Sequence, residues 1–162
     1  MNVLLTGGTG YIGSHTAVVL SQLGHQVVLY DNLCNSSDAV LDKLVQITGQ
    51  YIPFIKGDVR NTPLLADVLS AHRIDAVIHF AGLKAVGESV DKPVEYYANN
   101  VQGAISLLQA MDSVQVKKLV FSSSATVYGE PQYLPFDESH PTCATNPYGR
   151  SKLHIEEILQ DV

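Results

Sequence analysis

The sequence predicts an α/β fold, a doubly wound parallel sheet with helices on both faces. Short runs rich in β-branched residues alternate along the chain with longer stretches of helical periodicity. Strands that alternate with helices in this way are typical of right-handed crossovers in a parallel sheet. Because no repeat, low-complexity tract or linker interrupts the alternation, we expect one domain over residues 1–162.

Five apolar runs are too short to form helices. Parallel strands are buried on both faces, so runs of this kind predict strands of a parallel sheet. We expect these strands at residues 3–5, 27–30, 51–55, 76–80 and 119–121. Several of the stretches between them open with a capping residue or an early proline, which is typical of helix starts. We expect helices near residues 11–24, 38–48, 62–72, 94–112 and 147–161.

The composition argues against several classes of function. The chain has 10 basic and 16 acidic residues, a formal net charge of −6, and no extended basic run, so we expect no nucleic-acid partner. It has no stretch of about 18 consecutive apolar residues and no signal-peptide pattern, so we expect a cytoplasmic protein without a membrane partner. The two cysteines and six histidines show no metal-ligand spacing. We therefore expect free thiols and no metal site.

A glycine-rich turn, TGGTGYIG at residues 6–13, follows the first expected strand directly. It fits the spacing Gly8-x-Gly10-x-x-Gly13 and also the spacing Gly7-x-x-Gly10-x-x-Gly13. Glycines in such a turn permit a tight bend, let the backbone approach a pyrophosphate, and allow the helix to pack closely on the sheet. The phosphates then lie over the helix N-terminus, where free N–H groups and the helix dipole favour anions. The motif predicts a Rossmann dinucleotide site.

An aspartate at the end of the second expected strand supports this interpretation. Asp31 comes 18 residues after Gly13, where a carboxylate accepts hydrogen bonds from the adenosine ribose and repels a 2′-phosphate. The sequence therefore favours NAD over NADP. Asp58, in the Gly57-Asp58 turn after the third expected strand, is a candidate acceptor for the adenine amino group.

Two segments carry candidate proton-transfer groups. Tyr148 and Lys152 are four residues apart after Pro147, so they share one face of a helix that begins there. A lysine ammonium near a phenol favours the phenolate, which makes Tyr148 a candidate general base. The fifth expected strand runs into the hydroxyl residues Ser122, Ser123, Ser124 and Thr126. One of these hydroxyls could hydrogen-bond a substrate oxygen at the carboxyl edge of the sheet.

These segments resemble the extended short-chain dehydrogenase/reductase superfamily and, within it, the UDP-glucose 4-epimerase family. The longest of them, HFAGLKAVGES at 79–89, is more specific than either general motif. The resemblance is carried by residues 6–15, 31–33, 57–60, 79–89, 92–100, 121–129 and 148–152.

The resemblance implies residues for each part of bound NAD. Around the phosphates it implies Gly7, Gly10, Tyr11, Ile12 and Gly13; on the ribose, Asp31 and Asn32; beside the adenine, Asp58 and Val59. Along the rest of the dinucleotide it implies Phe80, Ala81, Gly82, Lys84, Asn99, Tyr148 and Lys152. The implied catalytic residues are Ser124, Tyr148 and Lys152.

The activity that the resemblance implies is NAD-dependent 4-epimerisation of a UDP-hexose, UDP-glucose or UDP-galactose. Tyr148 would take the proton of the 4-hydroxyl while C4 gives its hydride to NAD, and the hydride would return to the other face. The implied partners are a UDP-sugar and a second copy of the chain. The implied dimer helices lie near 94–112 and 147–161.

Three alternatives remain open from the sequence. A nucleotide-sugar 4,6-dehydratase shares the fold and the tyrosine–lysine pair, but that family places an Asp-Glu pair directly after the active-site threonine, whereas Thr126 is followed by Val127 and Tyr128. A sugar-nucleotide reductase often prefers NADPH, which Asp31 disfavours. The third alternative is a noncatalytic NAD-binding fragment.

The last expected helix reaches the final residue, Val162, without a glycine or proline stop signal. Members of the family are considerably longer, and their remaining part finishes the sheet and grips the uridine nucleotide and the sugar. We therefore expect an incomplete NAD-binding domain, without the C-terminal substrate-binding part, that is inactive alone.

Overall fold

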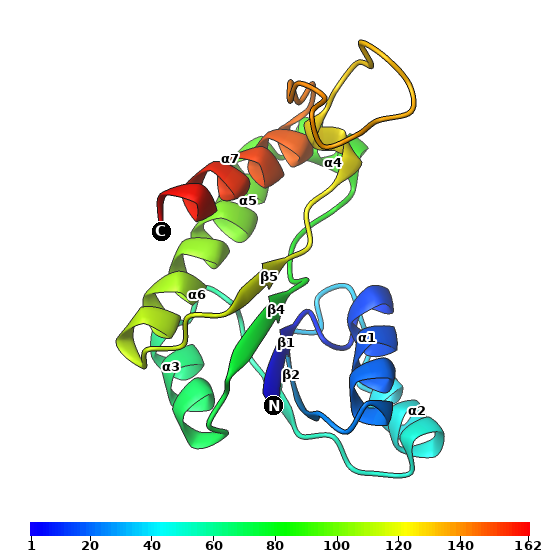
Figure 1. Ribbon diagram of the computed structural model, residues 1–162, viewed down its shortest axis with the longest axis vertical. Helices are drawn as coiled ribbons and strands as arrows, with labels where there is room; N and C mark the ends of the chain where they lie inside the picture. The colour runs from blue at the N-terminus through cyan, green and yellow to red at the C-terminus, as the bar shows by residue number, and fades with distance from the viewer. The chain divides into compact units, whose positions relative to one another are not determined.

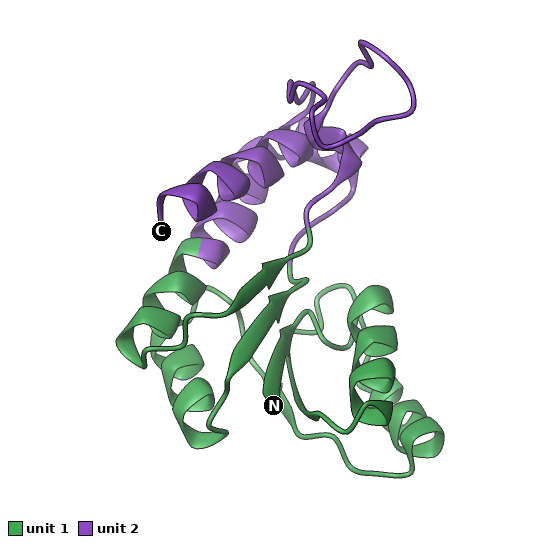
Figure 2. Cartoon of the chain, in the orientation of Figure 1, with its two compact units in different colours: residues 1–81, 105–122 green, residues 82–104, 123–162 purple.

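The computed structural model describes residues 1–162, and the chain divides into two compact units (Figure 2). Unit 1 contains residues 1–81 and 105–122, and unit 2 contains residues 82–104 and 123–162. Each unit is therefore built from two separate stretches of the sequence.

The sheet of unit 1 has five parallel strands in the order β3-β2-β1-β4-β5. The strands are β1 (Asn2–Thr6), β2 (Gln26–Asp31), β3 (Phe54–Lys56), β4 (Ala76–His79) and β5 (Leu119–Phe121). Val3 of β1 pairs with Val27 of β2 on one side and with Ala76 of β4 on the other. The strand order reverses at β1, so the carboxyl ends of β1 and β4 form the switch point at which doubly wound sheets bind ligands. The predicted fold class is confirmed.

Helices cover both faces of this sheet. The helices α1 (Tyr11–Gln22) and α2 (Ala39–Thr48) lie on one face, and α3 (Thr62–Ala71) and α6 (Gln102–Ser113) lie on the other (Figure 1). Successive strand residues point to opposite faces and build two cores. The core under α1 and α2 includes Val3, Leu5, Val27, Leu29, Ala17 and Leu44. The core under α3 and α6 includes Leu4, Val28, Val77, Leu65, Leu69, Leu107 and Met111.

Unit 2 is built from helices that pack against α7 (Pro147–Asp161). They are α4 (Val86–Asp91), α5 (Pro93–Tyr96), the π-helical turn η1 (Tyr97–Val101) and the 3-10 turn η2 (Ala125–Val127). The rings of Tyr97 and His154 stack between η1 and α7, with centroids 5.8 Å apart. These contacts fix the start of α7, which carries the tyrosine–lysine pair.

The third strand is shorter than the sequence predicts. We expected it from residue 51, but β3 begins at Phe54. Pro53 has no N–H group to give to a strand ladder, and the side chain of Tyr51 is exposed. The Pro53 carbonyl still accepts from Leu29 N at 2.8 Å, but the residue pairs of the ladder with β2 begin at Phe54.

The segment before the fifth strand differs most from the sequence prediction. The helix expected near 94–112 is divided into α5, η1 and α6, and α4 precedes it where no helix was expected. Pro93 starts α5 as its first residue, which suits proline because the first helical N–H has no intrahelical partner. The π-helical turn inserts one extra residue into the helix, and such insertions are frequent at functional sites.

Each unit carries one free cysteine, Cys34 in unit 1 and Cys143 in unit 2, and both are exposed. None of the helices combines the length and the apolar character that crossing a membrane would require.

Candidate functional site

The glycine turn between β1 and α1 is shaped by Gly7. Its φ of +68° lies in the left-handed region that glycine adopts without strain. The Gly7 N–H donates to the Tyr30 carbonyl oxygen at 2.8 Å, and the Gly7 carbonyl accepts from Gly10 N at 3.1 Å. A Cβ on Gly7 would lie 2.7 Å from Ala81 N. The turn is therefore pressed against the carboxyl ends of β2 and β4.

The other glycines of the motif have different roles. A Cβ on Gly13 would overlap with the carbonyl oxygen of Gly7, so Gly13 lets α1 approach the turn. Gly10 caps α1 and has only the Gly7 carbonyl near its Cβ position, at 3.2 Å. Gly8, which is absent from the predicted cofactor set, packs inward, where a Cβ would lie 2.8 Å from Leu5 O. Gly10 is the N-cap of α1, and the free N–H groups of a helix N-terminus are where a phosphate would be accepted.

The Asp31 carboxylate ties the glycine turn to the loop that follows β2. Its Oδ2 accepts from Thr9 N at 3.2 Å, and its Oδ1 accepts from Leu33 N at 2.9 Å and from Ser36 Oγ at 3.2 Å. An ionised carboxylate has about four acceptor positions, so Asp31 can still accept from a ribose hydroxyl. The predicted ribose residue is thus also a structural one.

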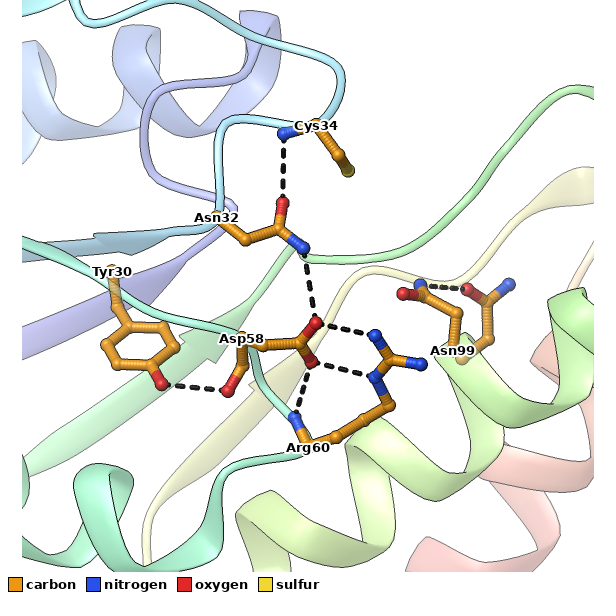
Figure 3. A network of polar contacts seen from close by, with 7 residues as sticks. Tyr30, Asn32, Cys34, Asp58, Arg60 and Asn99 are labelled. Atoms are coloured by element: carbon orange, nitrogen blue, oxygen red, sulfur yellow. Dashed lines mark hydrogen bonds and ion pairs between the residues drawn. The ribbon is translucent and has the colours of Figure 1, made fainter.

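The predicted adenine residue Asp58 is held by Arg60 (Figure 3). Arg60 Nη2 donates to Asp58 Oδ2 at 2.6 Å, Arg60 Nε to Oδ1 at 2.8 Å, and Asn32 Nδ2 to Oδ2 at 3.5 Å. The Arg60 hydrogen bonds lower the pKa of Asp58 to about 2. Tyr30 OH donates to the Asp58 carbonyl at 2.8 Å, and burial raises the pKa of Tyr30 to about 12. The carboxylate of Asp58 therefore has fewer acceptor positions left for adenine than the sequence predicts.

The remaining predicted residues of unit 1 fall into three environments. Val59 is buried in the core between the sheet and α3. Phe80 and Ala81 leave β4 beside Thr6, whose hydroxyl also contacts His79 Nδ1 at 2.6 Å. The side chains of Tyr11 and Ile12, at the start of α1, are 76% and 55% exposed. For these two residues, only the backbone N–H groups belong to the turn.

In unit 2, α7 begins as predicted. Asn146 caps it, its Oδ1 accepting from Gly149 N at 2.8 Å, and Pro147 is the first helical residue. Tyr148 therefore lies in the first turn and Lys152 one turn later on the same face. Both side chains are buried, and that of Lys152 is only 5% exposed. Burial lowers the pKa of Lys152 to about 8, and the charge of Glu156 acts in the opposite direction.

Ser124 is presented by the short turn η2. Its Oγ accepts from Thr126 N at 3.2 Å and from Thr126 Oγ1 at 2.9 Å, which leaves the Ser124 O–H free to donate to a substrate oxygen. A Cβ on Gly149 would lie 2.8 Å from Thr126 O. Gly149 therefore allows η2 to pack closely against the start of α7, where Tyr148 lies.

A buried amide links the loop at Leu83 to α7. Asn100, only 2% exposed, accepts from Leu83 N at 2.8 Å and donates from Nδ2 to Leu83 O and to Ser151 Oγ, both at 3.0 Å. Ser151 Oγ in turn donates to Tyr148 O at 2.7 Å. The predicted residue Asn99 donates to Asn100 Oδ1 at 3.0 Å (Figure 3). This network joins the backbone of Leu83 and the side chains of Asn99 and Asn100 to the tyrosine–lysine turn of α7.

Gly82 and Lys84, the last two predicted residues, flank Leu83. A Cβ on Gly82 would lie 3.2 Å from Asn100 Oδ1 and 3.7 Å from Lys152 Nζ, so Gly82 borders the network closely. Lys84 is exposed. The structure thus brings Gly82 next to Lys152 but leaves the side chain of Lys84 outside the network.

Sequence reasoning missed several residues that support the site. They are Asn100, Ser123, Gly149, Ser151 and Glu156, all in unit 2. Each stands beside a predicted residue or one helical turn from one, and helical spacing from Tyr148 would have marked Ser151 and Glu156. The partner of each, however, lies far away in the sequence, so its role could not be read locally.

The fold and these two sets of residues define a class of protein. A doubly wound sheet with a glycine turn and an aspartate after β2, together with a Tyr-x-x-x-Lys helix, is typical of a nucleotide-dependent short-chain dehydrogenase/reductase. The sequence profile of the GDP-mannose 4,6 dehydratase family matches residues 4–162. The chain belongs to this family, which is part of that superfamily.

The most informative relatives are epimerases, as the sequence resemblance predicts. The UDP-glucose 4-epimerase of Yersinia pestis is 57% identical over 163 residues, covering 100% of this chain and 48% of the relative. The crystal structure of UDP-glucose 4-epimerase from Stenotrophomonas maltophila, with bound NAD and formylated UDP-arabinopyranose, matches with a TM-score of 0.98 and 52% identity. The enzyme from Bifidobacterium longum, in complex with NAD+ and UDP, matches with a TM-score of 0.97 and 52% identity.

Both structures are matched over 99% of this chain and 48% of theirs. The chain therefore spans about half the length of the relatives it matches and is similar to their N-terminal half.

Proposed function

We propose that the chain binds NAD and supplies the proton-transfer residues for 4-epimerisation of a UDP-hexose. The observation that carries the proposal is the capped start of α7, which puts Tyr148 and the buried Lys152 on one face of a helix. The identity of 57% to a UDP-glucose 4-epimerase supports the assignment of this helix to epimerase chemistry.

The residues of unit 1 fit the adenosine and phosphate part of NAD. The turn presents backbone N–H groups at the N-terminus of α1, where Gly10, as the N-cap, adds no side chain. Asp31 keeps acceptor capacity for a ribose hydroxyl and would repel a 2′-phosphate. The resemblance extends the set to Asn32, Asp58, Val59, Phe80 and Ala81 in unit 1 and to Gly82, Lys84 and Asn99 in unit 2.

NAD, when bound, supplies a hydride acceptor for the sugar C4 and returns the hydride afterwards. Tyr148 takes the proton from the 4-hydroxyl and gives it back at the end of the cycle. The free O–H of Ser124 donates to the same oxygen. Lys152, while charged, favours the phenolate of Tyr148.

Elimination of water by a 4,6-dehydratase is the second candidate reaction, since the matching family profile has that description. Such a reaction needs an acid and a base beside the reacting carbons. After Thr126 the chain has Val127, which is buried, and Tyr128, so no carboxylate follows the threonine. This supports epimerisation over elimination.

We propose further that the uridine nucleotide of the substrate is bound by the part corresponding to the half of the relatives that this chain does not match. The chain alone, mixed with NAD and UDP-galactose, should therefore show no turnover in a coupled assay for UDP-glucose, and a normal enzymatic rate would contradict this. The homodimer implied by the resemblance would use the segments near 94–112, which contain α5, η1 and α6, and 147–161, which is α7; sedimentation would then give twice the chain mass of 17.5 kDa.

The cofactor proposal is tested by its nucleotide preference. Acid extraction of purified chain should release NAD, and calorimetric titration of the emptied chain should show tighter binding of NAD than of NADP. Asp31→Asn keeps the shape but removes the charge, so the NAD-to-NADP affinity ratio should fall by about tenfold, equivalent to about 1.4 kcal/mol. Asp38→Asn, which changes an exposed aspartate without a side-chain cap bond, is the control. An unchanged ratio in Asp31→Asn would refute the role of Asp31.

A further inference from the structure

A serine–glutamate hydrogen bond in unit 2 lies outside the roles assigned so far. Ser123 Oγ donates to Glu156 Oε1. Ser123 directly precedes Ser124, and Glu156 belongs to α7; 33 positions of the sequence separate the two residues. Neither side chain is exposed. A glutamate of a helix is thus held by the segment that presents the substrate-facing serine.

The spacing on α7 puts Glu156 in line with the proton-transfer residues. Tyr148, Lys152 and Glu156 follow one another at intervals of four residues, so they form a stripe along one face of the helix. Lys152 is 5% exposed, and an ammonium group removed from water is costly unless an opposite charge faces it. Glu156 provides that opposite charge, since its carboxylate raises the pKa of Lys152 against the larger effect of burial.

Charged and titratable groups on the elements packed against α7 have other partners. Glu88 of α4 accepts from Lys92 Nζ at 3.1 Å and from Tyr96 OH at 2.9 Å. Asp91 of α4 and Glu95 of α5 act on Lys92. Tyr97 of η1 stacks on His154, and η2 carries no charged residue. The carboxylate that acts on Lys152 is therefore Glu156, on the same helix.

We propose that Glu156, held in place by Ser123, is a positioning residue that keeps Lys152 charged inside unit 2. The proposal rests on the function proposed above, because a charged Lys152 matters only if it acts on Tyr148. The bond from Ser123 keeps the carboxylate from turning away from the stripe toward water. Removing either partner should therefore make it easier for Lys152 to lose its proton.

The experiment measures the titration of Lys152 directly. In chain labelled with ¹³C-lysine, the Cε resonance of Lys152, assigned by its absence in Lys152→Arg, is followed from pH 6 to pH 11. The wild type should titrate near pH 8. Glu156→Gln should lower the midpoint by about one pH unit, because it removes an opposite charge that favours the ammonium form. Ser123→Ala should lower it by a smaller amount, and Glu156→Asp should restore most of the wild-type value.

Glu157→Gln is the matched control, since Glu157 is the next residue of α7 and is exposed. Its midpoint should equal that of the wild type. An unchanged midpoint in Glu156→Gln, or an equal fall in Glu157→Gln, would overturn the proposal. If Glu156→Gln does not fold, Ser123→Ala tests the proposal instead, because it keeps the carboxylate and removes only its hydrogen bond. An unchanged Lys152 midpoint in Ser123→Ala would then overturn the proposal.

The titration requires neither cofactor nor substrate, so its failure is distinct from failure of the proposed function. A wild-type chain that does not bind NAD more tightly than NADP would refute the cofactor assignment, whereas an unchanged Lys152 midpoint in Glu156→Gln would refute the role of Glu156.

Discussion

The glycine turn of unit 1 and the tyrosine–lysine helix of unit 2 both place polar groups for a ligand. The turn uses backbone groups, whereas the helix uses side chains. In the turn, the groups belong to the backbone, and the side chains are absent so that β2, β4 and α1 can come close to Gly7. In the helix, the groups are side chains that are themselves buried, such as Lys152, and they depend on a network of other buried side chains.

The difference has a consequence for stability. The backbone N–H groups of the glycine turn have little desolvation cost, because they lie at a helix start where water or a ligand can reach them. A buried ammonium loses its hydration and is tolerated only because neighbouring groups compensate. The turn should therefore tolerate no added atoms, whereas the helix should tolerate no lost polar partners.

The largest effect should come from removing the amide that serves the helix. Asn100→Leu leaves Leu83 N–H, Leu83 C=O and Ser151 Oγ without their buried partner, at about 1–3 kcal/mol for each unsatisfied group. We expect the free energy of unfolding to fall by about 4 kcal/mol, measured by urea titration followed by circular dichroism. Asn99→Ala, which removes a single bond to Asn100, should cost less than about 1 kcal/mol. Equal losses in the two variants would show that the network does not hold the helix.

A somewhat smaller effect should come from adding one methyl group to the turn. Gly7 and Gly24 both have positive φ, +68° and +82°, but a Cβ on Gly24 meets nothing within 4 Å, whereas one on Gly7 meets Ala81 N at 2.7 Å. Gly24→Ala should cost about 1 kcal/mol from backbone strain alone. Gly7→Ala should cost about 3 kcal/mol, because crowding adds to the strain. If urea unfolding gave similar losses for Gly7→Ala and Gly24→Ala, the close approach of Ala81 would not explain why residue 7 is glycine.

The third change should stabilise the protein, whereas the first two destabilise it. Lys152→Met removes a buried charge and should raise the free energy of unfolding at pH 7 by about 2 kcal/mol, within the limit set by 1.36 kcal/mol per pKa unit. The unfolded lysine keeps its proton up to about pH 10.5, whereas the folded one releases it near pH 8. The wild type therefore gains stability between pH 8 and 10.5, and the advantage of methionine should shrink over that window.

Lys118→Met, at an exposed position, is the control and should change stability by less than about 0.5 kcal/mol at either pH. A destabilised Lys152→Met would mean that the interactions of the lysine outweigh its burial.

The same contrast explains which parts could be predicted from the sequence. The glycine turn, Asp31 and the start of α7 each carry a local sequence motif, although Gly7 and Asp31 also contact distant residues, and their fold context was predicted correctly. The strands were located because burial on both faces gives them continuous apolar runs. The start of β3 was placed too early because Ile52 is apolar and buried, whereas Pro53, which has no N–H, can only accept a hydrogen bond from β2.

The supporting residues of unit 2 could not be predicted because their partners are distant in the sequence. Asn100 and Ser151 are 51 positions apart, and Ser123 and Glu156 are 33 apart. The π-helical turn that presents Asn100 inserts a residue into the backbone, and no side-chain pattern in the sequence marks such an insertion. The assignments of NAD contacts to single residues stay predictions.

The two exposed cysteines allow a distance between the two units to be measured. Because Cys34 belongs to unit 1 and Cys143 to unit 2, labelling both thiols with nitroxide places one spin on each unit without altering the sequence. Cys34 also belongs to the loop that Asn32 and Asp31 organise, its N–H donating to Asn32 Oδ1 at 3.0 Å. A distance distribution recorded between the two spins, with and without added nucleotide, would therefore report directly on whether cofactor binding draws the units into a single arrangement.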